Sequence, residues 1–236
     1  MNIKHKRDVI IACDFPDGEK TLDFLALFGS ERPFVKIGME LFYAEGPDIV
    51  KKIKSRGHKV FLDLKLHDIP NTVFSAMRSL RTLDIDMCNV HAAGGQAMMK
   101  TAIEGLTRPD GSRPLLIAVT QLTSTSPEML RHELLISHPI EEVVMSYAQN
   151  ARAAGLDGVV CSPLEAERVH AVCGDDFITV TPGIRFSGGD MSDQVRVTTP
   201  AIARELGSDY IVVGRPITSS PDPIGAYRRC LADFIG

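Results

Sequence analysis

One segment of the chain reads Phe61-Leu62-Asp63-Leu64-Lys65-Leu66-His67-Asp68-Ile69-Pro70-Asn71-Thr72. Its first half is an apolar run interrupted only by Asp63 and Lys65, which is typical of a strand buried in a parallel sheet. Pro70 then opens a stretch in which apolar residues recur at helical spacing, namely Val73, Met77 and Leu80. The segment therefore predicts a strand that passes through a short polar turn into a helix, which is one βα unit.

The same pattern occurs eight times along the chain. Short apolar runs, each followed by a polar turn and a helical segment, cover residues 9–13, 34–38, 59–66, 87–91, 115–121, 158–161, 177–181 and 210–213. Eight such units in 236 residues predict an α/β fold, a closed (β/α)8 TIM barrel that forms a single domain over residues 1–236. An open, doubly wound sheet is the alternative, but no Gly-x-Gly-x-x-Gly turn follows the first run.

The composition argues against several classes of partner. The net charge is −4, and no basic cluster indicates nucleic acid or a membrane surface. No apolar run approaches the 18 residues of a membrane span, and the first residues lack the apolar core of a signal peptide. The 5 cysteines include no Cys-x-x-Cys pair, which favours a reducing compartment. We therefore expect a cytoplasmic protein that holds any acidic ligand through a few placed groups.

Charged residues fall at the ends of the predicted strands, where barrels of this type carry their active sites. Asp63 and Lys65 are two residues apart, so a regular strand would point them the same way, and Lys36 on the neighbouring strand can reach the same carboxylate. Buried ions are costly unless they are paired. A buried ion pair that only fixes the strand register is the plainer interpretation, but three converging charges favour a catalytic cluster. Other polar or turn residues at strand ends are Asp14, Asn89, His91, Gln121, Thr123, Pro182 and Gly183.

A second candidate site follows the last predicted strand. There the chain continues as Gly214-Arg215-Pro216-Ile217-Thr218, so a glycine, an arginine and a helix start come together. Backbone N–H groups, a helix start and a guanidinium all favour phosphate. The preceding loop, residues 181–199, contains Arg185 and Gly188-Gly189 and is long enough to act as a lid. A surface loop with incidental arginines is the alternative.

The opening segment strongly resembles the signature of the orotidine 5′-monophosphate decarboxylase family. Further matches to the family are Ala12-Cys13-Asp14, Phe34-Val35-Lys36-Ile37-Gly38, Val119-Thr120-Gln121-Leu122-Thr123-Ser124, Thr181-Pro182-Gly183-Ile184-Arg185, Asp193-Gln194-Val195-Arg196 and Val213-Gly214-Arg215-Pro216-Ile217-Thr218. The resemblance covers essentially the whole chain. It implies a carboxy-lyase that converts orotidine 5′-monophosphate to uridine 5′-monophosphate and carbon dioxide, the last step of de novo pyrimidine nucleotide synthesis, without metal or cofactor.

The resemblance also implies residue roles. Lys65 is similar to the family's proton donor to C6, Asp63 and Asp68 to the acidic members of its charged network, and Lys36 to the second lysine. The implied substrate contacts are Asp14 and Lys36 for the ribose, Thr123 for the pyrimidine, Gln194 between pyrimidine and phosphate, and Arg185, Gly214 and Arg215 for the phosphate, with Pro182 beside them. Asp68 and Thr72 are similar to residues that enter the neighbouring subunit's site, which implies a homodimer.

Two alternatives stay open. Magnesium-dependent relatives, 3-keto-L-gulonate 6-phosphate decarboxylase and hexulose phosphate synthase, share the motif Asp-x-Lys-x-x-Asp. They carry an acidic residue on the second strand to help bind the cation, where this chain has Lys36. A catalytically silent phosphate-binding barrel is the other alternative. It is disfavoured because every lysine and aspartate of the charged network is present.

Overall fold

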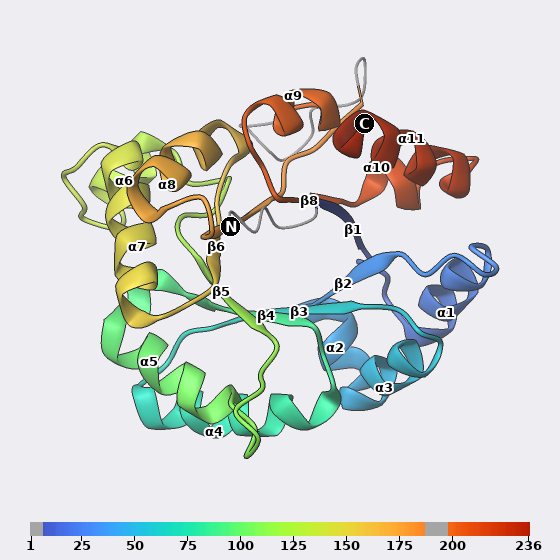
Figure 1. The fold of residues 1–236 in the computed structure, drawn as a ribbon, viewed down its shortest axis with the longest axis horizontal. Coiled ribbons are helices and arrows are strands. Elements are labelled where there is room, and N and C mark those ends of the chain that lie inside the picture. Colours follow the sequence, from blue (N-terminus) through green and yellow to red (C-terminus); the bar gives the residue numbers. More distant parts are fainter. Residues whose placement is uncertain (1–6, 187–197) are drawn as a thin grey trace.

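The fold is a closed barrel of parallel strands, seen here in a computed structural model that describes residues 7–186 and 198–236 (Figure 1). The strands follow one another around the barrel in sequence order. They are β1(Asp8–Ala12), β2(Phe34–Gly38), β3(Val60–Leu66), β4(Met87–His91), β5(Leu115–Val119), β6(Gly158–Val160), β7(Ile178–Thr181) and β8(Tyr210–Val213). Pairing of β8 with β1 closes the ring, from Asp8↔Tyr210 to Ile11↔Val213. Each predicted apolar run coincides with one of these strands to within two residues at either end, and the predicted (β/α)8 fold is confirmed.

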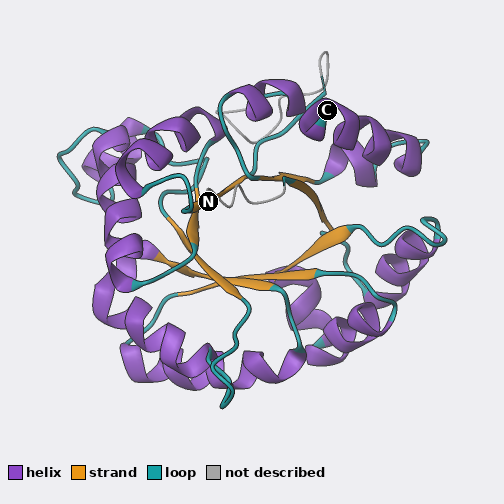
Figure 2. Cartoon of the chain, viewed as in Figure 1, coloured by secondary structure: helices purple, strands orange, loops and turns teal. Residues whose placement is uncertain are grey.

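Helices surround the barrel and follow the strands (Figure 2). They are α1(Gly18–Ala26), α2(Met39–Glu45), α3(Pro47–Ser55), α4(Pro70–Leu80), α5(Gly95–Leu106), α6(Pro127–His132), α7(Ile140–Ala154), α8(Ala166–Cys173), α9(Pro200–Glu205), α10(Arg215–Thr218) and α11(Pro223–Ile235), with 3-10 turns at Arg81–Leu83, Ala92–Gly94 and Pro163–Glu165. The predicted helix start at Pro70 is confirmed, and α3 likewise begins at a proline, Pro47; proline at the first turn loses no hydrogen bond. Gly155 ends α7 in the left-handed conformation (φ 94°).

Two apolar layers cover the two faces of the barrel wall. The larger layer lies between strands and helices. The smaller fills the interior with alternate strand residues, among them Phe34 on β2, Phe61 on β3 and Met87 on β4. Side chains two residues further along each of these strands continue on the inward face. Lys36, Asp63 and Asn89 therefore lie directly above an apolar floor.

Three aspartates tie neighbouring strands together at the amino ends of the strands. Asp86, Asp157 and Asp209 each stand immediately before an even-numbered strand and accept a hydrogen bond from a backbone N–H of the preceding strand. The donors are the amides of Val60 (2.8 Å), Leu116 (2.7 Å) and Thr179 (2.8 Å). The basic partners of the three carboxylates are Lys54, Arg113 and His170. We call these three aspartates the amino-end clips.

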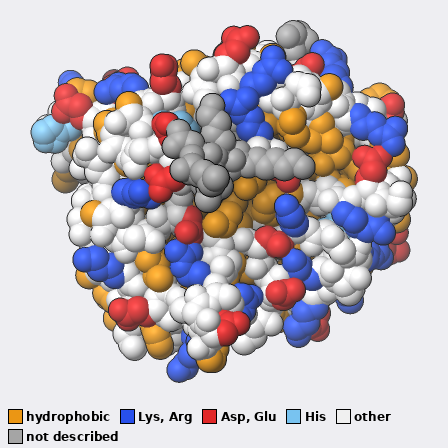
Figure 3. Space-filling view, viewed as in Figure 1, with side chains coloured by type: hydrophobic (Ala, Val, Ile, Leu, Met, Phe, Trp, Pro, Cys, Tyr) orange, Lys and Arg blue, Asp and Glu red, His pale blue; other side chains and the backbone are white. Residues whose placement is uncertain are grey.

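The surface carries charges of both signs. On the face shown in Figure 3, Lys and Arg side chains are interspersed with Asp and Glu and form no broad patch of one sign. Among the residues that the structure describes, no helix has both the length and the apolar character needed to cross a membrane. On this face, therefore, the described residues form no basic stripe of the kind that binds nucleic acid.

Candidate active site

A cavity of about 580 Å³ opens at the carboxyl ends of the strands. Residues on or just after every strand except β4 contribute to its lining. Lys36, Asp63 and Lys65 form one wall of the cavity, and Arg185 and Arg215 also line the cavity. This is the end of the barrel at which (β/α)8 enzymes hold their substrates. Most of the strand-end residues singled out in the sequence line the cavity, whereas Asn89 and His91 do not: those that line it are Asp14, Lys36, Asp63, Lys65, Gln121, Thr123, Pro182, Gly183, Arg185, Gly214 and Arg215.

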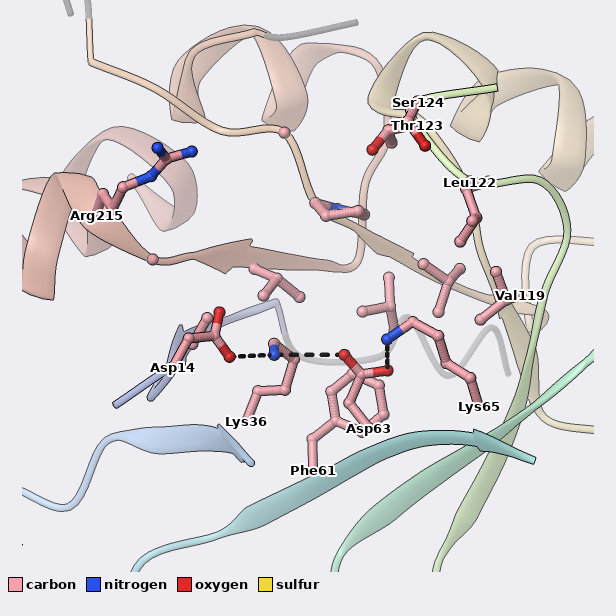
Figure 4. A pocket seen from close by; sticks show the side chains of 18 of the residues that line it. Asp14, Lys36, Phe61, Asp63, Lys65, Val119, Leu122, Thr123, Ser124 and Arg215 are labelled. Atoms are coloured by element: carbon pink, nitrogen blue, oxygen red, sulfur yellow. Dashed lines mark hydrogen bonds and ion pairs between the residues drawn. The ribbon is translucent and has the colours of Figure 1, made fainter. Parts of the chain in front are cut away.

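Four alternating charges run along one wall of the cavity (Figure 4). Lys36 Nζ lies 2.9 Å from Asp14 Oδ1 and 3.4 Å from Asp63 Oδ2. Lys65 Nζ lies 2.7 Å from Asp63 Oδ1. Lys36 and Asp63 are only 9% and 8% exposed, so water alone cannot solvate either charge. The order Asp14–Lys36–Asp63–Lys65 leaves no charge beside another of its own sign.

Pairing keeps these buried groups ionised. Burial by itself would lower the pKa of Lys36, but the attraction of Asp63 and Asp14, with hydrogen bonds to both, raises that pKa above its usual value. Burial would raise the pKa of Asp63, but Lys36 and Lys65, together with hydrogen bonds from Lys65 and Asn89, lower it. The cavity wall therefore stays charged at neutral pH.

The backbone of β3 is irregular at Lys65, which corrects the sequence argument. Lys65 has φ 52°, in the left-handed region that non-glycine residues rarely adopt. The register of β3 against β4 also shifts between Leu62 and Leu66. Regular strand alternation was therefore the wrong reason to expect Asp63 and Lys65 on one side, although both side chains do line the cavity.

Asn89 was singled out in the sequence only as a polar residue at a strand end, with no role assigned to it. Its side chain donates to Asp63 Oδ1 (2.7 Å) and accepts from the backbone N–H of Lys65 (2.8 Å). The available signal was its position, two residues after inward-facing Met87 in the carboxyl half of β4. A polar side chain at that position lies within reach of the charges on β3.

The described residues of the predicted phosphate site line the same cavity, and Arg215 lies on the side away from Lys65. Figure 4 places Arg215 on the side of Asp14, while Thr123, Ser124 and Leu122 lie across the cavity on the side of Lys65. Arg185, Pro182 and Gly214 also line the cavity. The helix that follows Gly214, α10, has only 4 residues, so its dipole is weaker than the predicted helix start suggested.

The loop that was predicted to act as a lid is described only at its base. There Arg185 N–H donates to Thr198 O and Thr198 N–H donates to Gly183 O, both at 2.9 Å. Gln194 and the Gly188-Gly189 pair lie outside the described residues.

Asp68 and Thr72 lie outside the cavity of their own chain. Both are exposed, on the turn after β3 and in the first turn of α4. Asp68 Oδ1 accepts from the N–H of Ile69 (2.6 Å), and Ile69 is 67% exposed. One chain therefore does not bring these two residues to the charged wall.

Potential metal ligands are not grouped in the described part of the chain. Among residues 7–186 and 198–236, no set of three or more His, Cys, Asp or Glu side chains could hold a metal ion. Asp63 is instead flanked by two ammonium groups, which would repel a cation. The position of Asp63 between two lysines suits a cavity wall that contacts an organic ligand.

A closed barrel with a charged cavity at the carboxyl ends of its strands defines the class of (β/α)8-barrel enzymes. The sequence model of the Orotidine 5'-phosphate decarboxylase / HUMPS family matches residues 7–230, and the chain belongs to this family. The predicted family and enzyme class are confirmed.

Individual relatives match along almost the full chain. It is 59% identical over 233 residues to an orotidine 5'-phosphate decarboxylase of Bacillus cereus (strain AH187), covering 98% of each sequence. Identity to that of Bacillus cytotoxicus is 58%, with the same coverage. The crystal structure of orotidine 5'-phosphate decarboxylase from Lactobacillus acidophilus is similar with a TM-score of 0.88 and 46% identity, covering 98% of this chain and 100% of that one.

Proposed function

We propose that this protein decarboxylates orotidine 5′-monophosphate to uridine 5′-monophosphate and carbon dioxide, the last step of de novo pyrimidine nucleotide synthesis. The observation that carries the proposal is the charged wall, in which the Lys65 ammonium faces the cavity 2.7 Å from the buried carboxylate of Asp63. The relatives reported above bear the name of this activity. The charges offer what a decarboxylation without an electron sink requires, namely fixed electrostatics and a proton.

The layout of the cavity supports a mononucleotide. A phosphate near Arg215 and Arg185 would leave the ribose beside Asp14 and Lys36, whose carboxylate and ammonium suit hydroxyl groups (Figure 4). The base would then lie between Lys65 and Thr123, with Pro182 lining the same cavity. The cavity's 580 Å³ is also within the usual range for small-molecule sites.

Lys65 is the proton donor in this proposal. When the bond between C6 and the carboxyl carbon breaks, its electron pair stays on C6 and carbon dioxide leaves. The ammonium stabilises the developing charge and then transfers a proton to C6. The neutral amine regains its proton from water, so the enzyme returns to its initial state. No cofactor takes part in any step.

Asp63 has a smaller role beside the substrate carboxylate. Two unit charges about 4 Å apart repel by about 4 kcal/mol at an effective dielectric near 20. The most proficient enzymes lower their barriers by about 20 kcal/mol or more. Repulsion is therefore a minor contribution, and the main function of Asp63 is to hold Lys36 and Lys65 in place.

The phosphate residues contribute binding energy at a distance from the reacting carbon. Arg185, Gly214 and Arg215 line the cavity, Arg215 on the side away from Lys65, and Gln194 completes the proposed set. Binding energy from a non-reacting group can drive closure of a loop and alignment of the ring. The hydrogen-bonded base of the loop, at Gly183, Arg185 and Thr198, provides a fixed attachment for such closure.

Asp68 and Thr72 act, in this proposal, in the site of a second copy of the chain. Their exposure, and that of Ile69 between them, supports an interface at this position. Mixing inactive Lys65→Ala with inactive Asp68→Ala would test it. Random re-pairing in a twofold dimer leaves about a quarter of all sites free of both changes, so activity should return to about that level. No recovery after subunit exchange would contradict sharing.

The decisive test of the function is an assay with a chelator. With orotidine 5′-monophosphate in EDTA, the absorbance of the orotate ring should fall at the same rate as with Mg²⁺. Loss only after Mg²⁺ is restored would contradict a metal-free reaction, which Lys36 on β2 supports because its ammonium would repel a cation from Asp63. No loss under either condition would contradict the proposed activity and favour a magnesium-dependent relative with another substrate or a silent phosphate-binding barrel. The described cysteines are all buried free thiols, which supports a cytoplasmic setting.

A further inference from the structure

Strand β4 contributes no residue to the lining of the cavity, yet it carries a side chain directly beneath the charged wall. Asn89 is 1% exposed and makes both of its hydrogen bonds to residues of β3. A buried amide is costly unless it is satisfied. Its two partners are the residues on which the proposed chemistry depends.

The two hydrogen bonds fix the orientation of the amide. The Lys65 backbone N–H can only donate, so it faces Asn89 Oδ1 at 2.8 Å. The ionised Asp63 carboxylate can only accept, so it faces Asn89 Nδ2 at 2.7 Å. Rotating the amide by half a turn would break both contacts. Asn89 is therefore held in one orientation, and it holds both partners in return.

These contacts coincide with a break in the strand ladder. From the pair Leu62↔Cys88 to the pair Leu66↔Val90, β3 advances by four residues and β4 by two, so β3 carries two extra residues. Lys65 lies in this bulge with φ 52°. A left-handed conformation at such a residue costs about 1–2 kcal/mol and persists only where neighbours impose it. Within this bulge the backbone N–H of Lys65 donates to the Asn89 side chain of β4.

We propose that Asn89 is a positioning residue for the reaction. It stabilises the left-handed conformation that aims the Lys65 ammonium at Asp63 and the cavity, and it fixes the Asp63 carboxylate between the two lysines. The inference rests on the proposed function in one respect, that Lys65 and Asp63 carry out the chemistry. Because a displacement of about 1 Å at a reacting group can cost about 10²-fold in rate, the position matters.

Two variants and one control test this role. Asn89→Leu has nearly the same shape and loses both hydrogen bonds, whereas Asn89→Asp keeps the acceptor for Lys65 N–H and loses the donor to Asp63. Thr120→Val is the control, because Thr120 is 2% exposed and donates to Val160 O (3.0 Å) at the same end of the barrel without touching the charged wall. All three remove a buried hydrogen bond.

The expected result is a change in kcat without a comparable change in KM. Asn89→Leu should lower kcat by about 10²-fold with a much smaller change in KM, because the phosphate contacts are untouched. Thr120→Val should keep the wild-type kcat. Equal kcat values for Asn89→Leu and wild type would overturn the proposal and leave Asn89 a structural residue.

The pH profile provides a readout that a purely structural role would not move. The ionisable groups that act on Asp63 are Lys36 from β2, Lys65 from β3, Asp14 through Lys36, and His91 from β4. Loss of the Asn89 donor raises the pKa of Asp63, and a second carboxylate in Asn89→Asp raises it further. The acid limb of kcat should therefore move to higher pH in both variants, most in Asn89→Asp. An unmoved acid limb in Asn89→Asp would contradict the proposal.

Crystal structures of Asn89→Asp and Asn89→Leu test the geometry independently of any activity assay. In Asn89→Leu, Lys65 should leave φ 52° and its Nζ should separate from Asp63; in Asn89→Asp, the Lys65 backbone should stay and the Asp63 carboxylate should turn away. Unchanged contacts in both variants would overturn the positioning role, even if the wild type failed to decarboxylate orotidine 5′-monophosphate. If only the wild-type assay failed, the proposed function alone would fall.

Discussion

The two ends of the barrel both pair aspartates with basic side chains, but they pair them differently. At the amino ends, Asp86, Asp157 and Asp209 each receive a backbone N–H as well as a basic side chain. At the carboxyl ends, Asp14, Lys36, Asp63 and Lys65 pair with one another through their side chains. Main-chain donors are fixed by the fold, whereas side-chain charges around a cavity can act on a ligand.

This difference assigns stability to one end and chemistry to the other. An amino-end clip joins two consecutive strands, β3 to β4, β5 to β6 or β7 to β8, and none of the three aspartates lines the cavity at the carboxyl ends. The charged wall faces a cavity and leaves the Lys65 side chain partly exposed. In (β/α)8 enzymes the amino face generally serves stability and the carboxyl face catalysis. Changes at the two ends should therefore separate folding from turnover.

The largest effect is expected from Lys65→Ala. General-acid catalysis and electrostatic stabilisation are both lost, so kcat should fall roughly 10⁴-fold or more. Binding of uridine 5′-monophosphate, measured by calorimetry, should persist because the phosphate residues are intact. Substantial residual turnover would reject Lys65 as the proton donor.

A smaller loss of activity is expected from Arg215→Ala. Removal of a charge-assisted phosphate contact should cost about 2–4 kcal/mol and lower kcat/KM roughly 10²-fold, with kcat reduced as well through poorer closure. Arg228→Ala, which changes a 66% exposed arginine paired with Glu31, serves as the control. Steady-state kinetics in which Arg215→Ala matched Arg228→Ala would remove Arg215 from the phosphate site.

At the amino end, Asp86→Ala should lower stability and leave turnover alone. The buried N–H of Val60 loses its acceptor and Lys54 its partner, which costs about 1–3 kcal/mol and about 2–12 °C in Tm. Asp48→Ala, at the exposed pair with Lys51, is the matched control and should change Tm little. A fall in kcat at 25 °C for Asp86→Ala would break the division between the two ends.

The smallest effect is a change of stability with pH. Lys36 and Lys65 outweigh burial and lower the pKa of Asp63 in the folded protein below its usual 3.8. The unfolded chain therefore takes up its proton first, and the stability that Asp63 contributes is present above about pH 4 and is lost as pH falls through the lowered pKa. Urea denaturation of wild type and Asp63→Asn should show a difference that narrows below pH 4. Parallel curves would contradict ionic pairing of Asp63.

Much of the fold could be predicted because its causes are local. Parallel strands buried on both faces need continuous apolar runs, and Pro47 and Pro70 mark helix starts. The convergence of Lys36, Asp63 and Lys65 followed from the closed ring of strands. The bulge at Lys65 did not, because nothing in its neighbours along the chain specifies a left-handed lysine.

The remaining features depend on contacts between distant residues. Asn89 meets Asp63 across 26 positions, and Arg113 meets Asp157 across 44, so no local pattern indicates either pair. The sequence also could not decide whether the helix after Gly214 would be long or short, and α10 has 4 residues. Asp68 and Thr72 need a second copy of the chain, and they were assigned through the family resemblance alone.

The central claim is that the charged wall at the carboxyl ends, and not the similar pairs at the amino ends, performs a metal-free decarboxylation. The most direct test is the turnover number for orotidine 5′-monophosphate in EDTA, measured side by side for wild type, Lys65→Ala and Asp86→Ala at 25 °C. We predict full turnover for wild type and Asp86→Ala and almost none for Lys65→Ala. Equal losses in the two variants, or no turnover by the wild type without Mg²⁺, would contradict it.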